Sequence, residues 1–387
     1  MKTLYYVAAL MVYLGCTGQT QREAASTNQN APKYIQKIDA LFKNFNNKES
    51  PGGYAIAITK GNKVLYTKGY GIANLEYDIP ITKKSVFSIA SVSKQFTGAA
   101  IAVLIMDGKL TLNDDASKYI PALKKYPHQI QIKHLLYNTS GLQDYYRLPR
   151  ANGASWNSLK YFDIDEAIAT SIKQDTLLFK PGKKWSYCNV NFMLLTKVVE
   201  KVSGQQFPQF MQDRIFKPLK MNQSLINDDI TNIIKNRVIP YRLRTPEVIQ
   251  QYQQSGIKVN DQGKYLQHWR VSPHYGGSGV MTTVEDLAKW SINFATKQFG
   301  GQKFRDLMLK TIKFEHPKSN QAFGLYIGDF NGRQIFAWDG GDAGISSQHM
   351  HFTKEKVGII CLSNLGSGRS YQKVNQIADI LIAEGIM

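Results

Sequence analysis

The sequence predicts an α+β fold: an antiparallel sheet assembled from the N-terminal and C-terminal segments, covered by helices, with a mainly helical part inserted. Three observations predict it. Hairpin patterns lie near both ends of the chain, apolar residues at helical spacing open and close the folded body, and the middle is typical of helices and loops. We expect one folded unit, residues 33–387, with a sheet part (33–109 and 271–387) and a helical part (110–270).

The first block of this unit is predicted to be a helix followed by a hairpin. Residues 34–45 are apolar on one helical face. Residues 53–59 and 64–68 are typical strands, and the Lys-Gly-Asn-Lys turn between them is a hairpin signal. A second helix is expected over the apolar stretch that starts around Ser91 and ends near Gly108.

The C-terminal block is predicted to supply the remaining strands. Residues 323–330 and 334–338 flank an Asn-Gly-Arg turn, and two further strands are expected at 345–352 and 357–363. The closing segment 371–386 has apolar residues at helical spacing. Strands from both ends of the chain can therefore join in one antiparallel sheet.

The middle of the chain is predicted to be helical. Residues 192–202 and 207–216 each have one apolar face. No internal repeat and no shift of composition marks a linker. These features favour one unit with two parts over a string of separate domains.

The composition is that of a globular protein with a large positive charge. The 387 residues include 48 Lys and Arg against 29 Asp and Glu, a formal net charge of +19. A surplus of this size suits nucleic acid, an anionic membrane surface or an acidic polymer. Three cysteines in a chain of this length exclude a small disulfide-stapled fold. We expect Cys188 and Cys361 to be buried free thiols, with a disulfide between them as the alternative.

The N-terminus predicts export. The uncharged run Leu4–Leu14 has the length of a signal-peptide core and is too short to span a bilayer. We assign residues 1–20 to a signal peptide and residues 21–32, which are polar, to a flexible tether. Cys16 is a candidate lipid anchor, and cleavage near Gln19 without lipidation is the alternative. The predicted location is the periplasm or cell envelope, where no nucleic-acid partner is needed to explain the charge.

The residues that carry chemistry begin with Ser91 and Lys94, which are one helical turn apart and therefore share a face. A serine hydroxyl needs a base to act as a nucleophile, and a lysine can serve if burial lowers its pKa. The same Ser-x-x-Lys spacing occurs at 255–258 and 370–373, where a solvated loop and a helix N-cap are the expected roles. Only Ser91 is followed by a Tyr-x-Asn tripeptide, Tyr187 to Asn189.

These motifs resemble the serine β-lactamase and penicillin-binding-protein superfamily, in its class C, D,D-peptidase and esterase-like branch. The similarity runs from about residue 33 to the C-terminus. The segments that carry it are 87–96 around Ser91, Leu135–Leu142 with Thr-Ser-Gly, 179–189 with Tyr-Cys-Asn, and 277–287.

The resemblance implies roles for these residues. Ser91 would be acylated, and Lys94 would take or shuttle its proton. Tyr187 would act with Lys94 as base and then as acid toward the leaving group, for which a tyrosine needs neighbouring cations. Asn189 would bind the acyl side chain of the substrate and Lys94. The substrate would be a small molecule or peptidoglycan-like, cleaved without a cofactor or metal by a monomer.

The third motif departs from the family. The segment that matches it runs from Trp338 to Gly344, and Trp338 stands where the family has a cation. Gly340 would let the substrate approach the strand, and the amide of Gly341 would be an oxyanion donor beside that of Ser91. A second departure, Asn138 in place of a histidine before Thr-Ser-Gly, is expected to be structural.

The missing cation predicts weaker binding of a substrate carboxylate. Asp339 and Asp342 would repel such a group further, unless a residue such as His274 compensates. We therefore expect an ester or amide with a neutral or cationic end, cleaved by a serine hydrolase. The alternative is a penicillin-recognising or substrate-binding protein with little or no turnover.

Overall fold

The computed structural model describes residues 31–45, 52–150, 161–260, 262–268, 272–312 and 320–387. The expected signal peptide, Cys16 and nearly all of the expected tether lie outside these described residues. Within them, no helix combines the length and apolar character needed to cross a bilayer.

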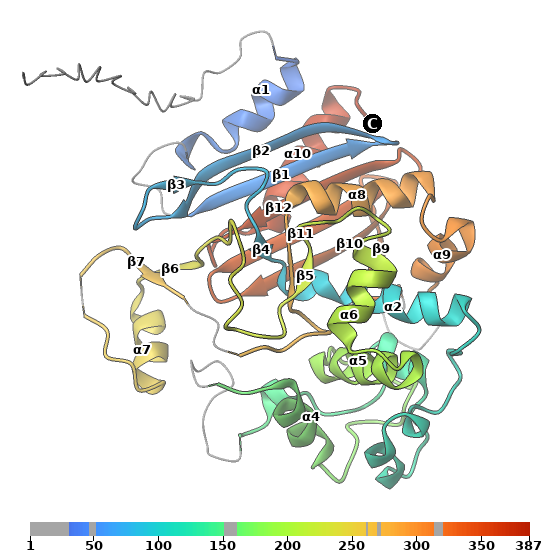
Figure 1. Ribbon diagram of the computed structural model, residues 1–387. Helices are drawn as coiled ribbons and strands as arrows, with labels where there is room; N and C mark the ends of the chain where they lie inside the picture. The colour runs from blue at the N-terminus through green and yellow to red at the C-terminus, as the bar shows by residue number, and fades with distance from the viewer. Residues whose placement is uncertain (1–30, 46–51, 151–160, 261, 269–271, 313–319) are drawn as a thin grey trace, which may run out of the picture.

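A seven-stranded antiparallel sheet forms the upper half of the molecule (Figure 1). Its strand order is β3-β2-β1-β12-β11-β10-β9, so strands from the two ends of the chain meet where β1 pairs with β12. This confirms the predicted fold class. The strands are β1 (Gly53–Lys60), β2 (Lys63–Asn74), β3 (Ile79–Pro80), β9 (Tyr326–Phe330), β10 (Arg333–Asp342), β11 (Ile345–Phe352) and β12 (Val357–Ser363).

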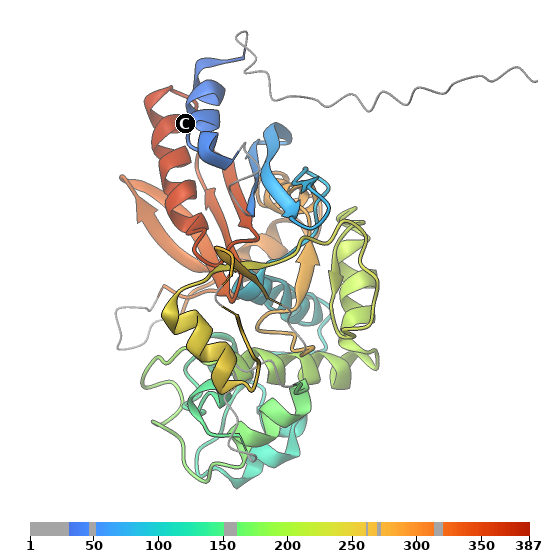
Figure 2. The same ribbon diagram turned by 90° about the vertical axis from the view of Figure 1, so that its left-hand side faces the viewer.

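Helices cover both faces of this sheet, which explains why β11 and β12 are buried along their whole length. On one face lie α1 (Lys33–Ala40) and α10 (Ser370–Ala383), packed on apolar residues such as Ile56 and Ile359. On the other lie α8 (Val284–Thr296) and α2 (Lys94–Met106), as the two views of Figures 1 and 2 show.

A polar cluster fixes α1 on the sheet. Asp39 of α1 accepts hydrogen bonds from Tyr66, from Tyr70 at 2.6 Å and from Lys68 at 3.0 Å, all three on β2. Burial raises the pKa of Asp39, but these hydrogen bonds outweigh it and the pKa is lowered. The ionised carboxylate therefore joins the N-terminal helix to the sheet.

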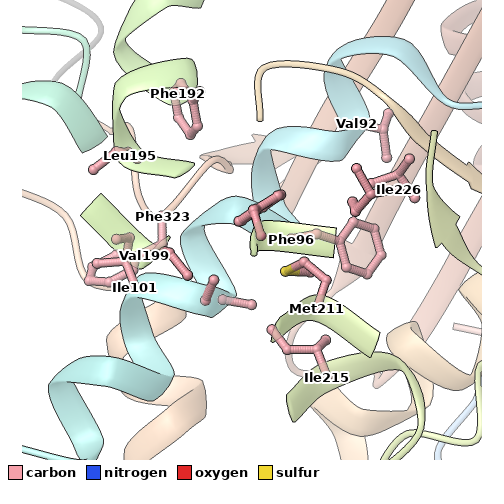
Figure 3. Packing of buried hydrophobic residues seen from close by; sticks show 14 of the residues in the cluster. Val92, Phe96, Ile101, Phe192, Leu195, Val199, Met211, Ile215, Ile226 and Phe323 are labelled. Atoms are coloured by element: carbon pink, nitrogen blue, oxygen red, sulfur yellow. The ribbon is translucent and has the colours of Figure 1, made fainter. Parts of the chain in front are cut away.

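The helical part packs around α2, which runs through the centre of the molecule. Figure 3 shows Phe96 and Ile101 of α2 among residues of neighbouring helices, including Phe192, Leu195 and Met211. Next to α2 lie α5 (Asn189–Ser203), α6 (Phe207–Met211) and α9 (Gly301–Met308), and α3 (Ile132–Leu136) and α4 (Ile164–Ile172) pack on α5. Helix α7 (Pro246–Gln254) lies apart from them, beside β6 (Tyr241–Leu243) and β7 (Tyr265–Gln267) (Figure 1). The other short strands are β4 (Phe87–Ser88), β5 (Leu225–Ile226) and β8 (Val280–Thr282).

Several local predictions need correction. The α-helix expected to start around Ser91 begins at Lys94, because the preceding residues form a 3₁₀ turn. Ser370 is not the N-cap of the closing helix: Arg369 occupies that position, and Ser370 is buried and donates to the carbonyl oxygen of Ser346 at 3.0 Å. The loop expected at Ser255 is present: Ser255 lies in the turn that follows the last residue of α7.

The two cysteines of the folded body are as predicted. Cys188 and Cys361 are both buried free thiols. Cys188 precedes the first residue of α5 and Cys361 lies on the central strand β12. The free-thiol interpretation is therefore confirmed, and the alternative of a disulfide is wrong.

Candidate active site

Ser91 lies in a tight turn at the start of the central helix. This 3₁₀ turn, Ala90–Ser93, leads directly into α2. Ala90 has a φ of 45°, a costly conformation for a residue with a side chain, and it is buried. Gly340 of β10 lies against the turn: a Cβ there would be 2.5 Å from the carbonyl oxygen of Ile89 and 3.0 Å from the amide nitrogen of Ser91. The strand and the turn together position Ser91.

Lys94 is fully buried one turn after Ser91. Its Nζ is 3.2 Å from Ser91 Oγ, 2.9 Å from Asn189 Oδ1 and 2.7 Å from the carbonyl oxygen of Gly277. Burial lowers the pKa of Lys94 to about 7, against the opposing effect of the Asp144 charge. A neutral amine has two N–H groups and one lone pair. The oxygens of Asn189 and Gly277 can take the N–H groups, which leaves the lone pair for the hydroxyl of Ser91.

The hydroxyl of Tyr187 also contacts Ser91, 2.7 Å from its Oγ. Its ring lies beside Lys94, with Nζ 4.8 Å from the ring centroid. Burial raises the pKa of Tyr187, and the charges of Asp144 and Asp339 raise it further. The role expected for Tyr187 needs neighbouring cations, and in the described part of the chain the ammonium beside it is Lys94, which is itself half-neutral near pH 7. Tyr187 keeps its proton at neutral pH.

Asn189 is the first residue of α5, and a carboxylate for which the sequence gives no local signal orients it. Oδ2 of Asp144 accepts both the backbone amide of Asn189, at 2.8 Å, and its side-chain Nδ2, at 3.0 Å. Because Nδ2 is held there, Oδ1 faces Lys94. Asp144 is buried, and burial raises the pKa of its carboxyl against the hydrogen bonds from Asn189.

Asn138 holds the segment that carries Tyr187 and Asn189 in place through hydrogen bonds. It is buried with a φ of 56°, and its Oδ1 accepts from the side chain of Asn191 at 3.1 Å and the backbone amide of Cys188 at 3.3 Å. It therefore joins the Thr-Ser-Gly loop to the start of α5, which agrees with the structural role expected for it.

The three residues predicted from the third motif lie on β10 beside Ser91. The ring of Trp338 is nearly parallel to that of Tyr187, with an angle of 19° and centroids 6.4 Å apart. Gly341 faces open space, since a Cβ there would meet no heavy atom within 4 Å. Gly340 was expected to let the substrate approach the strand. In the structure, the absence of a side chain at Gly340 makes room for the turn that contains Ser91. Among described residues, β9 pairs with β10 only as far as Ala337, so the edge of β10 beyond it has no partner strand.

Two hollows meet at Ser91, and Tyr187 and Gly341 line both of them. The hollow on the side of Trp338 has a volume of about 450 Å³. The other, of about 340 Å³, lies on the side of Asn189 and Gly277. A bound molecule can therefore extend to either side of Ser91. Further described residues include Trp185, Tyr326 and Asp339 in the first hollow and Tyr146, His274 and Asp342 in the second.

The structure thus brings together Ser91, Lys94, Tyr187 and Asn189, and adds contacts that no local pattern indicated. Asp144 lies two residues beyond the Leu135–Leu142 segment, but a single aspartate in a loop gives no signal of its own. Within the described ranges, no group of three or more His, Cys, Asp and Glu side chains is arranged to hold a metal ion.

Comparisons with known proteins identify the family. The family described as Beta-lactamase matches residues 38–384. The D-aminopeptidase of Gluconobacter oxydans (strain 621H) is 27% identical over 315 residues, which are 81% of this chain and 56% of that protein. Protein flp of Staphylococcus aureus (strain MW2) is 30% identical over 345 residues, 86% of this chain and 63% of that protein.

The chain therefore spans less than two thirds of the length of these two relatives. Among solved structures, D-amino acid amidase from Ochrobactrum anthropi SV3, complexed with L-phenylalanine amide, has a TM-score of 0.72 at 18% identity. The structural match covers 92% of this chain and 100% of the amidase, so the two chains have the same fold. With its fold, its cluster around Ser91 and a family match over most of its length, this chain belongs to the beta-lactamase family.

Proposed function

We propose that this chain is an exported serine hydrolase that cleaves an ester or amide through an acyl-enzyme on Ser91. The observation that carries the proposal is the contact between Ser91 Oγ and the buried amine of Lys94, whose pKa of about 7 makes a neutral base available near neutral pH. The names D-aminopeptidase and D-amino acid amidase, carried by similar proteins, favour amides of D-amino acids within the wider class of β-lactams, peptides and carboxylic esters.

The contacts support a proton path for acylation. Ser91 Oγ attacks the carbonyl carbon while its proton passes to the neutral Nζ of Lys94. The new oxyanion accepts the backbone amides of Ser91 and Gly341. Tyr187, which is protonated, gives its proton to the leaving group as the bond between the carbonyl carbon and the leaving group breaks, and it receives a proton from the ammonium of Lys94. Water then releases the acyl group by the reverse path.

The charges around Ser91 favour a substrate without a carboxylate. Trp338 lines the first hollow with Asp339, and His274 lines the second beside Asp342. A carboxylate would meet an aspartate in either hollow. The substrate class that fits best is therefore an ester or amide with a neutral or cationic end.

Intact-mass measurement after exposure to a fluorophosphonate tests the nucleophile. We expect one adduct per chain in the wild type and none in Ser91→Ala. Ser255→Ala is a matched control, because Ser255 has the same Ser-x-x-Lys spacing and lies outside the site. An adduct that survives in Ser91→Ala, or no adduct in the wild type, would contradict the proposal. A panel of β-lactams, D-amino-acid amides and short-chain esters then identifies the bond cleaved.

Trp338 also favours a second candidate, a penicillin-recognising or substrate-binding protein on the same fold with little turnover. Loss of the cation at this position removes a group that the resemblance assigns to substrate binding and to keeping the base neutral. A stable penicillin adduct on Ser91, with no release of product over hours, would favour this candidate over a hydrolase.

Export, a possible lipid anchor at Cys16 and a monomeric state complete the proposal. The predicted signal peptide supports export, and the positive charge suits an anionic cell envelope without nucleic acid. The mass of the mature N-terminal peptide tests this: a diacylglycerol on Cys16 indicates an anchor, and a free N-terminus near Gln19 indicates simple cleavage. An intact N-terminus at Met1 would contradict export through this signal.

A further inference from the structure

The hollow beside Trp338 combines aromatic rings with one carboxylate. Of the described residues that line it, four are aromatic (Trp185, Tyr187, Tyr326 and Trp338), Asp339 is acidic, and none is Lys, Arg or His. This composition contrasts with the net charge of +19 of the whole chain. The local chemistry of the hollow is therefore opposite in sign to the average surface.

The aromatic rings come from three separate elements. Trp338 lies on β10 and is nearly parallel to Tyr187, with centroids 6.4 Å apart. Tyr326 lies on the neighbouring strand β9, opposite Ala337, and is 41% exposed. Trp185 comes from the loop before α5. Rings from a strand pair and a loop thus surround a space of about 450 Å³ that opens onto Ser91.

The negative charge of Asp339 lies at the wall of this hollow. It is exposed on β10, and its charge raises the pKa of both Lys94 and Tyr187, which places it near the reacting groups. Aromatic faces carry negative electrostatic potential and attract organic cations, most strongly at tryptophan. Rings and carboxylate therefore select the same kind of ligand, an apolar group that carries a positive charge.

The position of the hollow assigns the part of the substrate that enters it. Asn189, which the family resemblance assigns to the acyl side chain, lines only the other hollow. Tyr187, the proposed proton donor to the leaving group, lines both. The space at Trp338 is therefore left for the leaving group.

We propose that the hollow formed by Trp185, Tyr326, Trp338 and Asp339 binds an organic cation in the leaving group of the substrate. This inference rests on the proposed hydrolase function and narrows its substrate class. It predicts that an ester of a quaternary-ammonium alcohol is cleaved faster than the same acyl ester of an uncharged alcohol of equal shape.

Matched esters test this directly. Butyrylcholine is compared with the butyrate ester of the carbon isostere in which a tert-butyl group replaces trimethylammonium. We expect kcat/KM to be about tenfold higher for the cation in the wild type, the scale of a cation–π contact assisted by an exposed carboxylate. The ratio should fall toward one in Trp338→Leu and decrease in Asp339→Asn. Tyr371→Ala, which removes an exposed aromatic residue on α10, is the control and should keep the wild-type ratio.

A ratio of one or less in the wild type would overturn the inference, as would a preference for cations that appears only when the charge is on the acyl side. A binding measurement separates this failure from failure of the proposed function. Calorimetry with Ser91→Ala, which needs no turnover, compares choline with its tert-butyl alcohol isostere. Tighter binding of choline that is lost on Trp338→Leu supports the site, and equal binding refutes it. Absence of fluorophosphonate labelling refutes the hydrolase alone.

Discussion

Replacement of Asp144 by Asn is expected to lower the pKa of Lys94 while the hydrogen bonds around Asn189 remain. Both of these bonds end on one oxygen, Oδ2 of Asp144, and the amide oxygen of an Asn side chain can accept them in the same place. The substitution therefore removes a negative charge and, on the other oxygen, the 3.4 Å hydrogen bond that Oδ1 accepts from the backbone amide of Tyr146. Because that charge stabilises the ammonium form of Lys94, its removal favours the neutral amine.

The geometry sets the size of this effect. Nζ of Lys94 is 2.9 Å from one end of the Asn189 amide, and Asp144 Oδ2 is 3.0 Å from the other. At a separation of about 7 Å and an effective dielectric constant of about 20, Coulomb's law gives about 2 kcal/mol, or roughly 1.5 pKa units. The pKa of Lys94 is about 7 in the wild type, and half of the amine is neutral at that pH. We therefore expect this midpoint to move to lower pH by about one unit or more in the variant.

The assay is the second-order rate of fluorophosphonate labelling of Ser91 as a function of pH. The rate should rise with pH through the pKa of Lys94 in both proteins, with the earlier rise in Asp144→Asn. Asp339→Asn is the matched control: this carboxylate is exposed and affects Lys94 less, so its midpoint should move in the same direction by a smaller amount. An unchanged midpoint in Asp144→Asn, or a shift to higher pH, would refute the electrostatic coupling.

Two further predictions concern stability. Gly340→Ala should lower the free energy of unfolding by about 1–3 kcal/mol, because its Cβ would be 2.5 Å from the carbonyl oxygen of Ile89. Gly341→Ala is the control and should leave the melting temperature unchanged, since its Cβ would meet no heavy atom within 4 Å. Equal effects of the two substitutions would contradict the packing argument. Asp39→Ala should cost about 1–3 kcal/mol at neutral pH. Since the folded-state pKa of Asp39 is lowered, its contribution is present above the unfolded pKa and lost as pH falls through the folded one. Denaturant titrations at neutral and acid pH should therefore show the difference between wild type and variant shrinking in acid, and a constant difference would count against the ionised cluster.

Much of the fold could be predicted because its strands are marked by local signals. The strands 345–352 and 357–363 begin and end where the sequence predicts, because polar turns delimit both runs of β-forming residues. The start of α2 was misplaced because periodicity does not distinguish an α-helical turn from a 3₁₀ turn. The turn at Ser91 depends on Gly340, which is remote in sequence.

The candidate site also contains residues that local motifs predict and residues that they do not. Ser91, Lys94, Tyr187 and Asn189 could be identified because they stand in short motifs with characteristic order and spacing. Asp144 could not, because its importance comes from where a loop folds back against α5. The direction of the Tyr187 pKa was also out of reach, since burial decides it and burial depends on the complete fold.

The edge of β10 next to Ser91, which has no partner strand among the described residues, has a consequence for assembly as well as for binding. A strand edge with open backbone groups is a template on which a second chain can add its own strand, and many proteins protect such edges with charge. Asp339 and Asp342 lie on this edge, so two copies brought edge to edge would oppose like charges. The carboxylates that shape the choice of substrate also discourage self-association through the sheet. Asp339→Asn therefore removes part of this protection against sheet-to-sheet dimers.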